Sequence, residues 1–197
     1  MSCNETAIMT SASDVSRRSL FSILPTAAAG CLGCARAAHS WTEKAGMTWE
    51  EIFQFAFQKD LIPILKGLSA QIGSENLLRM LREISYWRVA QGIGRRAIPK
   101  RDLASFAAGI KFRPPLFQHA LDGEIIEDTP QVFAYRVTKC LWAKAFREED
   151  AGDIGYAMVC YPDYAVARAF NPKLKLIRTK TLMQGQDSCS LRYVMES

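Results

Sequence analysis

The side chains that can do chemistry in this chain are few, and cysteine is prominent among them. Of the 197 residues only two are histidines, His39 and His119, which disfavours a histidine-rich metal site or a serine hydrolase that depends on imidazole. Three of the six cysteines, Cys140, Cys160 and Cys189, lie in the C-terminal third of the chain. Any reaction should therefore depend mainly on Cys, Asp, Glu, Arg or Tyr side chains.

Three interpretations of the C-terminal cysteines are open. Cys160 or Cys189 is a nucleophile if an arginine or a helix terminus lowers the pKa of its thiol, because only the thiolate attacks. Together with Cys140 they can form a three-thiolate zinc site, although their spacing lacks the close cysteine pair typical of such sites. The third interpretation is that all three are small, buried hydrophobic side chains.

Residues 1–37 have the organisation of a signal peptide. The pair Arg17-Arg18 precedes an uncharged, mildly apolar run over residues 22–33, an order typical of twin-arginine export signals. Cleavage after residue 37 predicts an exported, periplasmic protein whose precursor meets the twin-arginine machinery. The alternative is a lipobox ending at Cys31, which would anchor the protein as a lipoprotein.

Composition places the remaining chain, residues 38–197, among ordinary globular proteins of one compact domain. Apolar residues make up 49% of the sequence and charged residues 23%, which excludes disorder, a collagen helix and a coiled-coil rod. The net charge of +5 is spread along the chain and does not favour nucleic acid as a partner. No later segment has the length of a membrane span, so the mature protein is expected to be soluble. The expected partner is a small-molecule substrate.

Helical patterns dominate residues 38–110. Thr48 and Glu51 form a capping box that predicts the start of a helix, which Pro63 should kink or break. Two further helices are predicted, over residues 74–89 and, after an Asp102 cap, over residues 103–108.

Residues 111–197 mix short strands with helices. A hairpin turn at Asp122-Gly123 is predicted between strands over residues 116–121 and 124–127. Asp163 is predicted to cap a helix over residues 164–170. The other predicted elements are strands over residues 132–137, 174–178, 181–183 and 191–195 and a helix over residues 139–149. The fold class is therefore α+β, with N-terminal helices packed on a mainly antiparallel sheet and two helices in the C-terminal half.

The C-terminal part also resembles a known family. Cys140, the segments Gly155–Tyr164 and Arg178–Cys189, and the tripeptide Phe170-Asn171-Pro172 resemble the L-2-amino-thiazoline-4-carboxylic acid hydrolase family. The chain ending is more remotely similar to four-vinyl-reductase-type ligand-binding domains, a similarity that suggests a fold and not an activity.

The hydrolase resemblance implies that water opens the ring of L-2-amino-thiazoline-4-carboxylate to give N-carbamoyl-L-cysteine. The ring sulfur leaves as a thiolate, which needs little acid assistance because the reference pKa of a thiol is about 8.5. The reaction still needs a carboxylate receptor, a nucleophile or water-activating base, and an anionic partner for the amidine-like nitrogens. The alternative on the same fold is a non-catalytic protein that binds or senses a small molecule.

These needs select the candidate site residues. Arg178 is the first candidate for the carboxylate receptor because its planar fork matches a carboxylate, and Arg136 is the second; either can instead be a strand-edge arginine paired with a surface acid. Thr181 is a further candidate for substrate binding. Asp187 can activate water or orient the amidine, but it also fits a plain turn. The candidate catalytic residues are thus Cys160, Cys189 and Asp187, without a metal.

Overall fold

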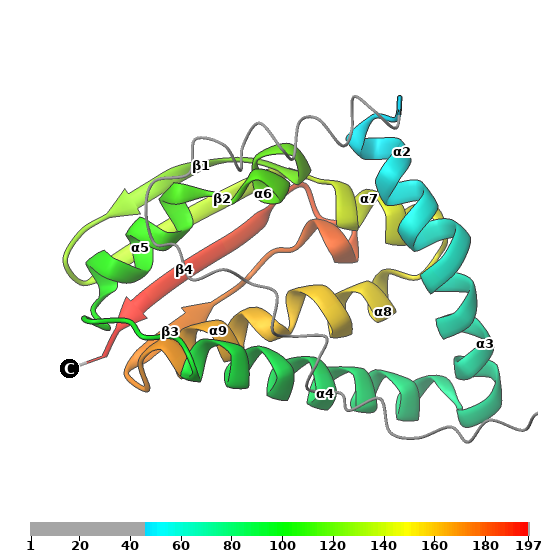
Figure 1. The fold of residues 1–197 in the computed structure, drawn as a ribbon, viewed down its shortest axis with the longest axis horizontal. Coiled ribbons are helices and arrows are strands. Elements are labelled where there is room, and N and C mark those ends of the chain that lie inside the picture. The colour runs from blue at the N-terminus through cyan, green and yellow to red at the C-terminus, as the bar shows by residue number, and fades with distance from the viewer. Residues whose placement is uncertain (1–45, 197) are drawn as a thin grey trace, which may run out of the picture.

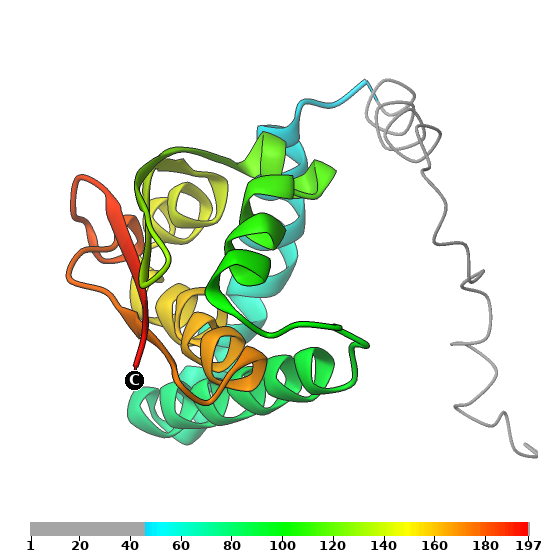
Figure 2. The same ribbon diagram turned by 90° about the vertical axis from the view of Figure 1, so that its left-hand side faces the viewer.

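A computed structural model describes residues 46–196; the predicted signal peptide and Cys31 lie outside this range. Four strands form an antiparallel sheet in the order β1-β2-β4-β3, and helices pack on one of its faces (Figures 1 and 2). The fold is therefore α+β, as the sequence predicts. Within the described range, no helix is long and apolar enough to cross a membrane. The strands are β1 (Leu121–Asp128), β2 (Val132–Cys140), β3 (Leu174–Ile177) and β4 (Cys189–Met195).

Helices precede the sheet and also connect β2 to β3. The first group is α2 (Trp49–Phe53), the π-helix η1 (Gln54–Leu61), α3 (Ile62–Ile72), α4 (Ser74–Gly94), α5 (Leu103–Phe112) and α6 (Pro115–Ala120). The second group is α7 (Leu141–Glu148), α8 (Gly152–Gly155), the π-helix η2 (Tyr156–Cys160) and α9 (Pro162–Phe170), and the 3-10 helix η3 (Leu182–Gln184) precedes β4. Because β2 and β3 are both antiparallel to β4, which lies between them, the second group is a crossover connection between parallel strands.

The N-terminal helices begin at the predicted caps. Thr48 Oγ1 accepts a hydrogen bond from the Glu51 amide at 3.2 Å, and the Glu51 carboxylate accepts from the Thr48 amide at 2.7 Å, which confirms the capping box. Asp102 caps α5 by accepting from the Ser105 amide at 2.9 Å. Pro63 does not end the first helical segment. It lies in the first turn of α3, directly after η1, and the backbone at Leu61 and Ile62 before it is already helical.

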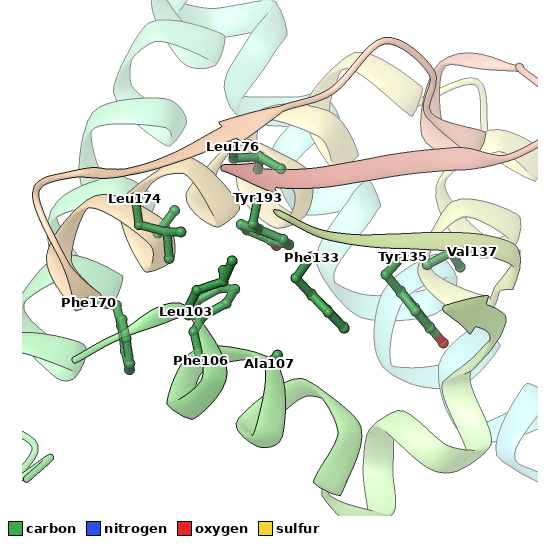
Figure 3. Close-up of a cluster of buried hydrophobic side chains, with 11 residues drawn as sticks. Leu103, Phe106, Ala107, Phe133, Tyr135, Val137, Phe170, Leu174, Leu176 and Tyr193 are labelled. Carbon is green, nitrogen blue, oxygen red and sulfur yellow. The ribbon is translucent and has the colours of Figure 1, made fainter. Parts of the chain in front are cut away.

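One face of the sheet is buried and the other is exposed to solvent. Side chains from β2, β3 and β4 meet α5 and α9 in a hydrophobic cluster (Figure 3). Its members are Leu103, Phe106, Ala107, Phe133, Tyr135, Val137, Ala167, Phe170, Leu174, Leu176 and Tyr193. On the opposite face, Arg136 pairs with Glu124, and Arg192 reaches across Ala134 to pair with Glu127. This alternation is expected of an antiparallel sheet with one solvated face.

A second hydrophobic cluster lies where the crossover helices meet η3. Its members are Ile62, Ala143, Phe146, Ala151 and Met183. The close approach depends on Gly155, because a Cβ there would lie 2.5 Å from Met183 Sδ and 2.7 Å from Phe146 Cγ. Cys140 and Leu182 contact both this cluster and the first, so they lie at the boundary between them.

The predicted hairpin turn at Asp122-Gly123 is wrong. Both residues lie inside β1, where the pairing with β2 shifts register, and the chain reverses between Thr129 and Val132. There the Thr129 hydroxyl accepts from the Val132 amide at 3.0 Å. The predicted strand over residues 116–121 is also wrong: Pro115 occupies the first turn of α6, which extends to Ala120.

Two further local predictions fail near the C-terminus. Residues 181–183 do not form a strand, because Thr181 caps η3 by accepting from the Met183 amide at 3.2 Å. Asp163 does not cap α9. The backbone at Tyr161 is already helical where η2 runs into α9, so no N-cap is needed there and the Asp163 carboxylate pairs with Arg178 instead.

Candidate functional site

Two thiols converge on one buried threonine at the boundary between the hydrophobic clusters. Thr181 is 2% exposed, and its Oγ1 lies 3.7 Å from Cys189 Sγ and 3.9 Å from Cys160 Sγ. Cys160 ends η2, Thr181 precedes η3, and Cys189 begins β4. The third thiol, Cys140 at the end of β2, is close enough to interact electrostatically with both of the other thiols. We call these four residues the thiol cluster.

The three sulfur atoms differ in their hydrogen bonds. Cys189 Sγ accepts from the Leu182 amide at 3.2 Å, and its thiol donates to Thr181. Cys140 Sγ accepts from the Ala143 amide at 3.4 Å and so caps α7. Within residues 46–196, no backbone amide donates to Cys160 Sγ. Because an N–H donor stabilises a thiolate, Cys189 is better placed than Cys160 to carry negative charge.

Burial raises the pKa of two of these thiols. It raises the pKa of Cys140 to about 11, against the opposing effect of the Ala143 amide. It raises the pKa of Cys160 to about 12, although the charge of Arg178 acts in the opposite direction. Both thiols are therefore protonated near neutral pH and are poor nucleophiles in the resting protein.

Iodoacetamide should consequently alkylate Cys140 and Cys160 slowly in the folded protein. At pH 8 we expect rates about a hundredfold or more below those in the urea-unfolded chain, because so little thiolate is present. The rates should rise about tenfold per pH unit up to pH 10, where an ordinary thiol has already reached its plateau. Timed labelling followed by peptide mass spectrometry measures each cysteine separately. Equal folded and unfolded rates would contradict the raised pKa values.

An ion pair between a buried arginine and a partly exposed aspartate adjoins the thiol cluster. The Arg178 side chain is 5% exposed; it donates through Nη2 to the Asp163 carboxylate and through Nη1 to the Cys160 carbonyl at 2.7 Å. Burial is the largest single effect and acts to lower the pKa of Arg178, but the charge and the hydrogen bond of Asp163, together with Cys160 and Tyr193, outweigh it and the pKa is raised. Among the residues that the structure describes, none forms a hydrogen bond with the buried Arg178 Nε. A buried donor of this kind is costly unless a ligand accepts from it.

Arg136 and Asp187 lie outside this group of contacts. Arg136 is on the exposed face of β2, where its guanidinium pairs with Glu124. Asp187 accepts from Lys180 Nζ at 3.1 Å through both carboxylate oxygens, and this hydrogen bond lowers the pKa of Asp187. A carboxylate whose pKa is lowered is a weaker base. The substrate-binding role of Arg136 and the catalytic role of Asp187 stay predictions, and none of these contacts favours them.

A cavity of about 400 Å³ opens beside the thiol cluster. Cys140 and Leu182 line it on the side of the cluster, and Lys144 and Arg147 of α7 line it on another. Lys144 pairs with Glu50 and Glu148, whereas Arg147 has no acid partner among the described residues. The volume and the free positive charge suit a small anionic molecule. Sequence reasoning missed Arg147 because nothing in its spacing distinguishes it from a solvated helix residue.

The three-thiolate zinc site is not supported by this geometry. Across residues 46–196, no group of three or more His, Cys, Asp or Glu side chains is arranged so that it could hold a metal ion. Each cysteine in this range is a free thiol.

Comparison with protein families gives a match over most of the chain. The family model described as L-2-amino-thiazoline-4-carboxylic acid hydrolase matches residues 49–193. This range includes the thiol cluster, the Arg178–Asp163 pair and the cavity beside them. A comparison with curated proteins finds no match.

Proposed function

This chain belongs to the L-2-amino-thiazoline-4-carboxylic acid hydrolase family, and on that premise we propose that it hydrolyses L-2-amino-thiazoline-4-carboxylate to N-carbamoyl-L-cysteine. The observation that carries the proposal is the convergence of Cys160 and Cys189 on Thr181, next to a buried arginine. A thiol, a hydroxyl and a guanidinium with an unpartnered N–H supply a nucleophile and an anion receptor in one place.

Cys189 is the proposed nucleophile. Its thiolate, stabilised by the Leu182 amide, adds to the ring carbon that lies between the sulfur and the two nitrogens. The ring carbon–sulfur bond then breaks, and the substrate sulfur leaves with the electron pair and takes up the proton that Cys189 released. The amidine carbon is now bonded to Cys189 Sγ.

Water completes the reaction at the same carbon. A water oxygen adds and one of its protons goes to the former ring nitrogen. The bond between this carbon and Cys189 Sγ breaks, and the Cys189 sulfur leaves with the electron pair and takes up the second proton of the water. The carbon keeps the oxygen as a urea carbonyl, so the product is N-carbamoyl-cysteine. One water is consumed for each ring opened, and no ammonia is released.

The Arg178–Asp163 pair is proposed to bind the substrate. The substrate carries a carboxylate and an amidine-like group, and the pair offers one charge of each sign. Arg178 Nε is free to donate to the carboxylate. The Asp163 side chain keeps 39% of its surface exposed, so it can also accept from the amidine nitrogens.

The direct test is to incubate the purified protein with the thiazoline acid in water enriched in oxygen-18. We expect free thiol and N-carbamoyl-cysteine in equal amounts, with one heavy oxygen in the urea carbonyl. Thiol titration and mass spectrometry measure both products. Binding of the thiazoline acid without thiol release would contradict the proposal and support a non-catalytic binding protein.

We also propose that the twin-arginine pathway exports the protein. The proposal rests on Arg17-Arg18 and the uncharged run that follows them. Replacing both arginines by lysine should retain the precursor in the cytoplasm, because the export receptor reads the arginine pair as an address. Cell fractionation and immunoblotting measure the distribution.

The matched control for export replaces Arg95 and Arg96, an exposed arginine pair after α4, by lysine. This variant should be exported normally. Export that is unchanged when Arg17 and Arg18 are replaced would exclude the twin-arginine assignment, and lipid labelling of Cys31 would indicate the lipoprotein alternative.

A further inference from the structure

A second cavity, of about 290 Å³, lies between the end of α5 and the edge strand β1, and none of the three described thiols lines it. Its apolar lining comes from Ile110, Ile125 and Phe133. Ile125 pairs with Tyr135 in the sheet and so lies on the same face, yet it is 47% exposed. The buried face of the sheet is therefore left partly uncovered at β1.

Arg113 reaches this cavity because two prolines end α5. Pro114 disfavours the helical conformation at the residue before it, and Arg113 adopts a φ of 39°, which is uncommon for a residue with a side chain. Gln118 Nε2 holds this turn by donating to the Arg113 carbonyl at 2.7 Å. The Arg113 guanidinium then donates through Nη2 to the Gly123 carbonyl at 3.0 Å and to the Tyr135 hydroxyl.

The charge of Arg113 has no acid partner in the described part of the chain. All four acids of the adjacent strand β1 pair with other cations: Asp122 with Lys139, Glu124 with Arg136, Glu127 with Arg192, and Asp128 with Lys111. Within residues 46–196, the Arg113 guanidinium donates only to carbonyl oxygens and a phenol. A partly buried guanidinium beside an apolar surface is thus left to bind an anion.

Tyr135 places a hydroxyl next to that guanidinium. Its side chain projects from β2 on the side of α5 (Figure 3), and its ring centroid lies 5.1 Å from Arg113 Cζ. Gly123 leaves room for the Tyr135 hydroxyl, because a Cβ at residue 123 would lie 2.8 Å from the Tyr135 hydroxyl oxygen and 2.3 Å from the Arg136 carbonyl oxygen. The glycine in the β1 irregularity therefore keeps the phenol and Arg113 together at the cavity.

We propose that this cavity binds a small carboxylate with an aromatic or branched apolar body. The carboxylate accepts from Arg113 and Tyr135, and the apolar body packs on Ile110, Ile125 and Phe133. The volume of about 290 Å³ is just below the range for ligand pockets, about 300 to 1,000 Å³, which selects a compact molecule. The site is separate from the thiol cluster and adds a second ligand to the proposed ring-opening function.

The test uses 3-phenylpropionate as the probe and its neutral amide as the matched comparison. Titration of the full chain, followed by NMR of isoleucine δ1 and leucine methyl groups, should give saturable shifts at Ile110 and Ile125. The amide should bind at least about tenfold more weakly, because it lacks the charge that Arg113 recognises. Arg113→Gln should weaken binding of the carboxylate by about tenfold to a hundredfold.

A second variant keeps the test decisive if Arg113→Gln does not fold. Ile125→Glu places a negative charge on the cavity wall at an exposed position and should abolish binding, whereas Ile126→Glu, at a position 54% exposed but outside the lining, should bind normally. Equal affinity for acid and amide, normal binding by Ile125→Glu, or the absence of shifts at millimolar probe would overturn the proposal. Shifts at the Leu182 methyl groups in place of Ile125 would also overturn it.

Discussion

Cys189→Ser and Cys189→Ala are expected to lose ring opening by about a thousandfold or more while still binding the thiazoline acid. Removal of a nucleophile removes the covalent step, and other groups in the site do not replace it. The Leu182 amide and Thr181 hydroxyl that contact Cys189 remain in both variants, so the surrounding geometry is kept. Thiol release measures turnover, and calorimetry with the intact ring measures binding.

Cys160→Ser is the matched comparison, because Cys160 contacts the same Thr181 hydroxyl. A hydroxyl at this largely buried position has few partners, so the variant should lose stability in urea unfolding more than it loses turnover. A loss of turnover confined to Cys160→Ser would transfer the nucleophile to that residue. Full activity in both variants would eliminate thiol catalysis and leave Asp187 as the leading base, to be tested by Asp187→Asn.

Arg178→Lys is expected to weaken apparent binding of the substrate by about tenfold to a hundredfold. Lysine keeps one positive charge for Asp163, but it loses the planar fork and the unpartnered Nε that would meet the carboxylate. A charge-assisted hydrogen bond contributes about 1.5 to 3 kcal/mol, which corresponds to that change in affinity. Calorimetric titration of the Cys189→Ala background measures it without turnover.

Two other variants separate binding from stability. Asp163→Asn leaves the Arg178 guanidinium buried without its counter-charge. We expect the free energy of unfolding to fall by about 2 kcal/mol, less than for a fully buried pair because Asp163 is partly exposed. This loss corresponds to a decrease in Tm of roughly 4 to 8 °C. Arg136→Lys, on the exposed face, should change neither quantity. Normal binding by Arg178→Lys together with weak binding by Arg136→Lys would move the carboxylate receptor to Arg136; Arg147 beside the cavity is the next residue to test.

Elements that depend on local contacts were predictable from the sequence. The caps at Thr48 and Asp102 depend on hydrogen bonds within one turn, so the residue types at that spacing suffice to predict them. Asp122-Gly123 shows the limit of this approach. The dipeptide is typical of a hairpin turn, but here the glycine is needed inside a strand, because a Cβ would meet the Arg136 carbonyl of the neighbouring strand. Only the pairing of the strands decides whether such a dipeptide forms a turn or lies within a strand.

The sequence identified several residues of the candidate site, but it did not predict all of the contacts between them. Resemblance to the family points to Cys160, Arg178, Thr181 and Cys189, which lie together in the fold. The Asp163 partner of Arg178 was missed, because its position after Pro162 fits a helix cap equally well and only the continuation of η2 into α9 removes that role. Long-range packing of this kind leaves no signal in spacing.

The position of β4 determines when the sheet can be completed during synthesis of the chain. β4 pairs with both β2 and β3, yet the ribosome makes it only after the whole crossover connection and β3. At ordinary translation speeds, roughly 2 to 10 s pass between the synthesis of β2 and that of β4. During this time one edge of β2 is unpaired, and strands in this state are prone to pair with other chains. Cys189 arrives with the same strand. Translation that stops before residue 189 therefore leaves a chain with an open sheet and without the proposed nucleophile.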